Sequence, residues 1–269
     1  GRDAHFRKAS FDLQQCPTSC PRPCMRVCPA EAIPSLPSTV GVDAARCYGC
    51  GRCLPACPLG LIVAHDHQQS REDLGSLLAT LTPDVVEVHT APGRGLEFSH
   101  TIDALLSTQQ PLKRLAVSCG LEGHGLTTSL LAQELWQRYS VLRRHGLRPL
   151  WQLDGRPMSG DVGRGTARAA IQLWQTLRPM APPGPLQLAG GTNESTWRLL
   201  QEAPHPMEWH PAGVAFGGQA RALVQPWLQQ ALERGQRLVD WPEGWAQALA
   251  QARTLVDPWL IARAGSPAC

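Results

Sequence analysis

Eight of the ten cysteines lie within residues 16–57, and cysteine thiolates are the usual ligands of iron–sulfur clusters. The second half of this window, residues 47–58, reads C-x2-C-x2-C-x3-C-P. Three thiolates so closely spaced on a tight loop can reach three irons of one cubane, whereas the fourth, Cys57, points away toward a second cluster. Gly49 and Gly51 let the backbone approach the inorganic sulfides, where N–H groups offset the negative charge.

The first half of the window repeats the second. It runs from Cys16 to Cys28 with x3 spacings and ends in Cys-Pro, and its loop is two residues longer than that of its twin. Phe11-Asp12 precedes the first cysteine as Val42-Asp43 precedes Cys47. We interpret this as an internal duplication, in which each half forms a short strand, a cluster loop and a helical turn.

The duplication resembles the bacterial ferredoxins that hold two [4Fe–4S] clusters and carry the fourth ligands crosswise. The predicted ligands of one cluster are Cys28, Cys47, Cys50 and Cys53, and those of the other are Cys16, Cys20, Cys24 and Cys57. A cubane in the longer first loop is less tightly held, and it can lose an iron to become [3Fe–4S].

Zinc and disulfides are the alternatives for so many cysteines. Zinc normally takes two separated pairs and closes a tetrahedron, and disulfide scaffolds spread their cysteines across a small domain. Neither explains three evenly spaced cysteines followed by Cys-Pro, twice over. Four arginines lie in or beside the loops, where they either raise the cluster potentials or are merely exposed: Arg22, Arg26, Arg46 and Arg52.

Composition narrows the function classes. The net charge of +3 on 269 residues does not favour nucleic acid, and no apolar run is long enough to span a membrane. The polar start shows no signal peptide. The packing of the cysteines into one short window favours metal in a reducing cytoplasm. The chain does not begin with methionine, which suggests a processed product or a fragment.

The remaining two-thirds of the chain alternate short apolar runs with helical stretches, which predicts βα units and a parallel sheet. We divide the chain into a ferredoxin-like domain, 1–70, and a (β/α) domain, 71–269. The expected strands are 84–89, 115–118, 150–153, 186–188 and 213–216, and the expected helices are 126–144, 165–177, 194–201 and 219–234.

Polar or glycine-rich segments follow each expected strand, as in a (β/α)8 barrel, whose functional loops follow its strands. Five units do not close a barrel. If three more preceded Gly1, the cysteine module would be an insertion; the alternative is a smaller open α/β sheet. Glycines after the last two strands predict a phosphate or flavin site formed by Gly190, Gly191, Gly217 and Gly218.

Other candidate sites are weaker. Asp154, Arg156 and Asp161 follow one strand and could bind a polar ligand, or form a structured loop in which the arginine pairs with an acid. Glu87 and His89 share a strand face without a third metal ligand in view. Cys119 is a lone cysteine after an apolar strand, and such cysteines more often pack in the core than react. Nothing in the sequence points to a role for Cys269.

The segments His5-Phe-Arg-Lys-Ala, Asp154–Asp161 and Leu188–Asn193, together with the cysteine motifs, resemble the light-dependent period (LdpA) family of oxygenic photosynthetic bacteria. The resemblance implies an iron–sulfur sensor that relays the cell's redox state, and hence light, to circadian clock proteins. In this interpretation the clusters report a quinone or ferredoxin pool. Since no nucleophile–base pair appears, a non-catalytic role is favoured. The rival is a flavin-dependent oxidoreductase in which the clusters feed electrons to a flavin at the barrel mouth.

Overall fold

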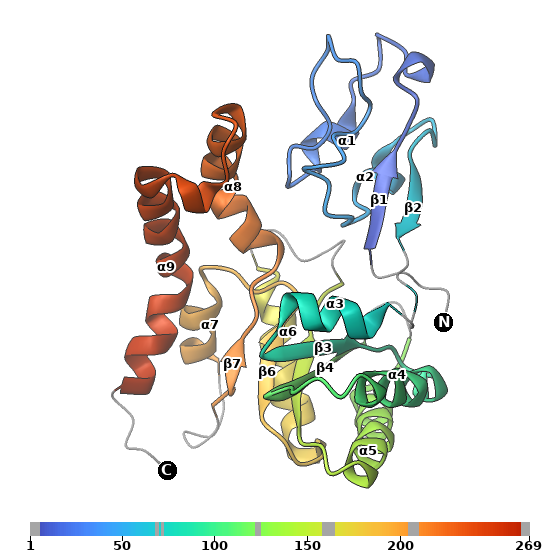
Figure 1. Ribbon diagram of the computed structural model, residues 1–269, viewed down its shortest axis with the longest axis vertical. Coiled ribbons are helices and arrows are strands. Elements are labelled where there is room, and N and C mark those ends of the chain that lie inside the picture. The colour runs from blue at the N-terminus through green and yellow to red at the C-terminus, as the bar shows by residue number, and fades with distance from the viewer. Residues whose placement is uncertain are drawn as a thin grey trace.

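A computed structural model describes residues 6–67, 70, 73–121, 125–157, 165–203 and 210–264 (Figure 1). Its N-terminal unit is small and rich in loops. Strands β1 and β2 form an antiparallel pair in which Phe6 lies opposite His67 and Ser10 opposite Val63. The elements are β1 (Phe6–Ser10), η1 (Leu13–Gln15), α1 (Pro23–Arg26), α2 (Cys53–Ala56) and β2 (Val63–His67).

The duplication is visible in the turns that lead into the two cysteine loops. Asp12 accepts a hydrogen bond from the Gln14 N–H at 3.0 Å, and Asp43 accepts one from the Ala45 N–H at 2.9 Å. Each aspartate thus organises the turn before the first cysteine of its half, where Ser, Thr, Asn and Asp compete well for backbone N–H groups.

The predicted strand before each loop is correct for the first half only. The second strand follows the second loop, because β1 needs one antiparallel partner and β2 closes the unit by supplying it. Ile33 and Ile62 lie five residues after Cys28 and Cys57, the last cysteine of each half, and both are buried in the core of this unit, beside Cys24 and Cys53.

The C-terminal unit is built on a parallel sheet of five strands in the order β3-β4-β5-β6-β7, which confirms the α/β prediction. The strands are β3 (Val85–His89), β4 (Arg114–Gly120), β5 (Pro149–Asp154), β6 (Leu186–Ala189) and β7 (Gly213–Val214). The helices are α3 (Leu74–Leu81), α4 (Gly95–Ser107), α5 (Thr128–Arg144), α6 (Ala167–Leu177), η3 (Arg178–Met180), α7 (Thr196–Glu202), α8 (Gly218–Glu233), η4 (Leu238–Asp240) and α9 (Pro242–Ala264).

One face of this sheet is apolar and carries the core. Val88, Val117, Trp151 and Leu186 lie side by side in register on that face. They belong to one buried cluster with residues of α3 to α7, such as Trp174. A sequential strand order with right-handed crossovers places successive helices on the same side of a sheet, which explains why the apolar residues gather on one face.

A buried arginine of α5 fixes the segment that follows β3 at the edge of the sheet. Arg138 in α5 is fully buried, and its guanidinium donates to Thr90 Oγ1 at 3.2 Å and to the Ala91 carbonyl at 2.7 Å. Glu134 balances its charge at 2.6 Å. The segment that follows His89 is therefore pinned to α5.

Within the described residues the sheet is open, since β3 and β7 each have a single neighbouring strand. The barrel stays a prediction. Helix α9, which the sequence pattern did not predict, packs on α8 at the β7 side of the sheet (Figure 1). None of the described helices is both long and apolar enough to cross a membrane.

Candidate iron–sulfur centre

The first predicted quartet of thiols comes together across the two halves. Burial is the main influence that raises the pKa of the Cys16 and Cys24 thiols. The nearby Cys57 raises the pKa of both further, although it belongs to the other half, and the charge of Arg22 opposes these rises. Cys20 also raises the pKa of Cys16.

The second predicted quartet comes together in the same crosswise manner. Burial, followed by the proximity of Cys50, Cys28 and Cys47, raises the pKa of Cys53 to about 12. Cys28 from the first half also raises the pKa of Cys50. These four cysteines line one cavity together with both loop glycines, Gly49 and Gly51.

Backbone N–H groups surround the sulfur atoms, as a cluster site requires. The Ala32 N–H donates to Cys28 Sγ at 3.2 Å. Burial alone would raise the pKa of Cys57, but the N–H groups of Leu61, Leu59, Ile62 and Gly60 together outweigh burial and lower it. Gly49 and Gly51 have φ angles of 79° and 73°, a conformation that glycine adopts without a steric cost.

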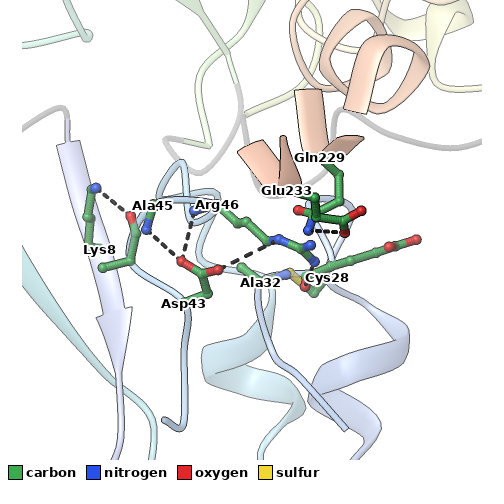
Figure 2. Close-up of polar contacts among 10 residues, drawn as sticks. Lys8, Cys28, Ala32, Asp43, Ala45, Arg46, Gln229 and Glu233 are labelled. Atoms are coloured by element: carbon green, nitrogen blue, oxygen red, sulfur yellow. Dashed lines mark hydrogen bonds and ion pairs between the residues drawn. The ribbon is translucent and has the colours of Figure 1, made fainter. Parts of the chain in front are cut away.

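A polar framework supports the Cys28 side of the site (Figure 2). Arg46 donates to the Glu31 carbonyl at 3.2 Å and lies 3.6 Å from Asp43, the aspartate that organises the turn before Cys47. Lys8 of β1 donates to the Ala44 carbonyl at 2.6 Å. These contacts tie the second loop to the first half and to the strand pair.

The nine described cysteines are free thiols, so the disulfide alternative fails for them. Among the described residues, no three His, Cys, Asp or Glu side chains are placed to hold a single metal ion. A cubane cluster needs a wider arrangement of ligands than a single ion, because each thiolate bonds a different iron. The four thiols therefore lie around the space that the cluster fills. Paired quartets, backbone N–H donors and a lined cavity fit such a cluster.

Helix α8 of the C-terminal unit reaches the second cysteine loop. The Arg221 guanidinium lies 4.7 Å from the centre of the Tyr48 ring, a cation–π contact. Tyr48 follows Cys47 directly and lines the cavity. The two units therefore meet beside the second quartet.

A second polar cluster lies on the sheet face opposite the core and joins residues that lie in separate motifs of the sequence. His89 Nδ1 is 2.6 Å from Ser118 Oγ, and Ser118 donates to Asp154 at 2.6 Å. Gln152 donates to Glu87 at 2.9 Å, and Gln187 donates to Gln152. The register of the strands brings these side chains together. The separate sequence motifs did not predict that they would form one cluster.

The glycine loops after β6 and β7 adjoin, because Thr192 Oγ1 donates to the Ala215 carbonyl at 2.5 Å. A β-carbon on Gly190 would lie 2.4 Å from the Arg156 carbonyl oxygen, and one on Gly191 would lie 2.9 Å from the Thr166 carbonyl oxygen. The backbone itself thus requires the first glycine pair. Gly217 precedes α8 and Gly218 begins it, and neither has a positive φ.

The other predicted site residues divide between buried, exposed and undescribed positions. Arg156 is exposed, and its backbone packs against Gly190. Cys119 is fully buried in the core, as expected of a cysteine that packs rather than reacts. Asp161 and Cys269 lie outside the described residues.

Two family profiles match the chain. A profile described as the LdpA iron–sulfur cluster-binding domain matches residues 16–68, and one described as the light dependent period A C-terminal domain matches residues 77–258. The chain is 41% identical to "Light dependent period A" of Synechococcus elongatus over 247 residues, 90% of this chain and 67% of that protein.

A shorter match covers the cysteine region. The chain is 33% identical over 66 residues to "Putative oxidoreductase UacF" of Escherichia coli, which is 24% of this chain and 10% of that protein. No solved structure matches the chain.

Proposed function

The chain belongs to the light dependent period A family and is an iron–sulfur protein, and from that premise we propose that it is a redox sensor with two [4Fe–4S] clusters. The eight cysteines of the window are the proposed ligands, and the fourth ligands, Cys28 and Cys57, cross between the halves. The observation that carries this proposal is the grouping of the thiols into two quartets, each completed by a cysteine of the other half.

The proposed role is to relay redox state rather than to catalyse a reaction. An iron–sulfur cluster supplies one-electron chemistry when bound. In this role the chain's own residues hold the cluster and shield it, and Tyr48 with Arg221 links its loop to α8. The name of the Synechococcus relative refers to a light-dependent period, which supports clock proteins as partners. The redox source in this proposal is a quinone or ferredoxin pool.

We also propose that the two units are domains, 1–70 and 71–269, and that the second forms consecutive units of a (β/α) barrel. Two observations support the barrel. The strand order is sequential, and the buried apolar residues lie on one sheet face while polar side chains lie on the other. Barrel walls share the sequential strand order and the helices packed on the outer face, with functional side chains at the strand ends.

An oxidoreductase is the second candidate. It is favoured by the likeness of the cysteine region to a putative oxidoreductase and by the adjoining glycine loops, which remain a predicted phosphate or flavin site. Backbone packing already accounts for Gly190 and Gly191, so the sensor is the better-supported function.

Iron and acid-labile sulfide analysis of anaerobically prepared protein tests the proposal. We expect about eight irons per chain and a broad charge-transfer shoulder in the visible spectrum. Cys50→Ala should lose about half of the iron, whereas Cys119→Ala, the matched control outside the window, should keep it. Four or fewer irons in the unaltered chain after reconstitution would contradict two cubanes. Resolved flavin bands in the same spectrum would favour the oxidoreductase.

A further inference from the structure

Arg22 is a charged residue buried inside the first cysteine loop. It is 6% exposed and lies between Cys20 and Cys24, with proline on both sides. Its φ of 47° places it in the left-handed region at the start of α1. A residue other than glycine persists in that region only when its surroundings impose it, and such residues concentrate at functional sites.

The Arg22 guanidinium has donors that the described part of the chain does not satisfy. Nη1 donates to the Pro34 carbonyl at 3.0 Å, which orients the side chain. Nε and Nη2 are buried and have no hydrogen-bond partner among the described residues. Because an arginine is always charged in proteins and buried unpaired donors are costly, this arrangement calls for an anionic acceptor within the loop.

The residues around Arg22 identify that acceptor. The Arg22 charge counteracts the effect of burial on the pKa of Cys16 and Cys24, so it lies close to both thiols. The loop from Cys16 to Cys28 contains no acidic residue in sequence. Thiolates and bridging sulfides of a bound cluster are acceptors of the required charge.

We propose that Nε and Nη2 of Arg22 donate hydrogen bonds to sulfur atoms of the cluster held by Cys16, Cys20, Cys24 and Cys57, and that Arg22 thereby raises the reduction potential of this cluster. The proposal rests on the proposed function, which supplies the cluster. One-electron reduction adds one negative charge to a cluster, and a nearby buried cation with two hydrogen bonds favours that state.

The proposal also explains why the first loop is longer than the second. Arg52 occupies the corresponding position of the second loop, two residues after Cys50, but it is only half-buried. The first loop adds Pro23 directly after its arginine, and proline fixes the backbone φ. The added residue holds Arg22 inward and makes the two cluster environments unequal.

The test is a redox titration of the full chain with dithionite and mediators, monitored by electron paramagnetic resonance. The variant is Arg22→Met, and the matched control is Arg26→Met, which removes an exposed arginine of the same loop. We expect Arg22→Met to lower the midpoint potential of the cluster whose signal Cys20→Ser abolishes, without changing the other potential. Arg26→Met should leave both potentials unchanged.

An unchanged potential in Arg22→Met at full iron content overturns the proposal. If Arg22→Met does not retain its cluster, electron–nuclear double resonance of the unaltered chain grown on 15N-arginine decides instead. A 15N coupling to the reduced cluster is expected, and its absence overturns the hydrogen bonds. An unaltered chain that binds no iron refutes the proposed function itself, which distinguishes the two failures.

Discussion

At the scale of single residues, Asp154 and His89 lie on the sheet face opposite the core and hold protons that an unfolded chain would release more easily. Burial raises the pKa of Asp154 to about 6, although Ser118 and His89 act in the opposite direction. The hydrogen bond to Glu87 is the main cause that raises the pKa of His89, which burial opposes. Both groups bind protons more tightly in the folded state than in the unfolded state.

The raised pKa values of Asp154 and His89 predict how stability changes with pH. Native Asp154 keeps its proton up to about pH 6, whereas the unfolded residue loses it near 3.8. Its contribution to the free energy of unfolding therefore falls as pH rises through this window, by at most about 3 kcal/mol. His89 adds a further loss as pH rises through its raised pKa.

Asp154→Asn removes the aspartate part of this effect. The quantity to measure is the free energy of unfolding of the variant minus that of the unaltered chain, obtained by urea unfolding at each pH. This difference should be higher at pH 7 than at pH 4 by up to about 3 kcal/mol, because only the unaltered chain loses stability over that range. Asp84→Asn, on an exposed carboxylate, is the control and should show a much smaller difference. A pH-independent effect of Asp154→Asn would show that the buried carboxylate is not protonated as described.

At the scale of elements, the two cysteine loops are repeats with unequal support. The second quartet lines one cavity with Gly49 and Gly51, and the turn before Cys47 is tied down through Asp43 and Arg46. The first loop has two more residues than the second. We therefore expect its thiols to be less preorganised.

The longer loop predicts that its cluster is the labile one. Brief exposure to air should yield a [3Fe–4S] signal by electron paramagnetic resonance, because a loosely held cubane loses one iron first. Cys20→Ser should abolish this signal, and Cys57→Ser should do the same, because that ligand crosses from the other half. Cys50→Ser is the matched control and should leave the signal in place. Loss of the signal in Cys50→Ser alone would reverse the assignment.

At the scale of the whole molecule, two units meet through α8 and the parallel sheet has two outer edges. The Arg221 guanidinium of α8 lies over the Tyr48 ring, so the helix that follows the last strand contacts the cysteine module. In the described residues, β3 and β7 have open outer edges. Open edges invite aggregation, and proteins cover or pair them.

The barrel proposal predicts that these edges are paired in a longer member of the family, such as the Synechococcus relative, 67% of which the match covers. Hydrogen exchange should then show slow exchange at the outward-facing N–H groups of β3, comparable with the amides of central β5. In the chain as given, the same groups should exchange rapidly, because the described part of the sheet offers that edge no partner. Rapid exchange in both proteins would contradict the barrel and favour the open sheet.

The cysteine chemistry and most of the α/β pattern could be read from the sequence. The spacing of Cys47 to Cys57 encodes a cluster loop locally, and the five apolar runs coincide with β3 to β7 within a few residues. Local signals suffice there, because a loop's reach and a strand's burial depend on neighbouring residues. Helix α9 was missed because Pro258 interrupts its pattern and its apolar residues are not confined to one face.

Sequence alone therefore determined which residues could hold iron and that βα units follow them. Only the tertiary structure decided what surrounds those residues. It brought Ser118 between His89 and Asp154, buried two Arg22 donors without partners among the described residues, and filled the space beside Gly190 with backbone. The physical reason is that hydrogen bonding and burial depend on atoms brought together from distant parts of the chain, which no local spacing specifies.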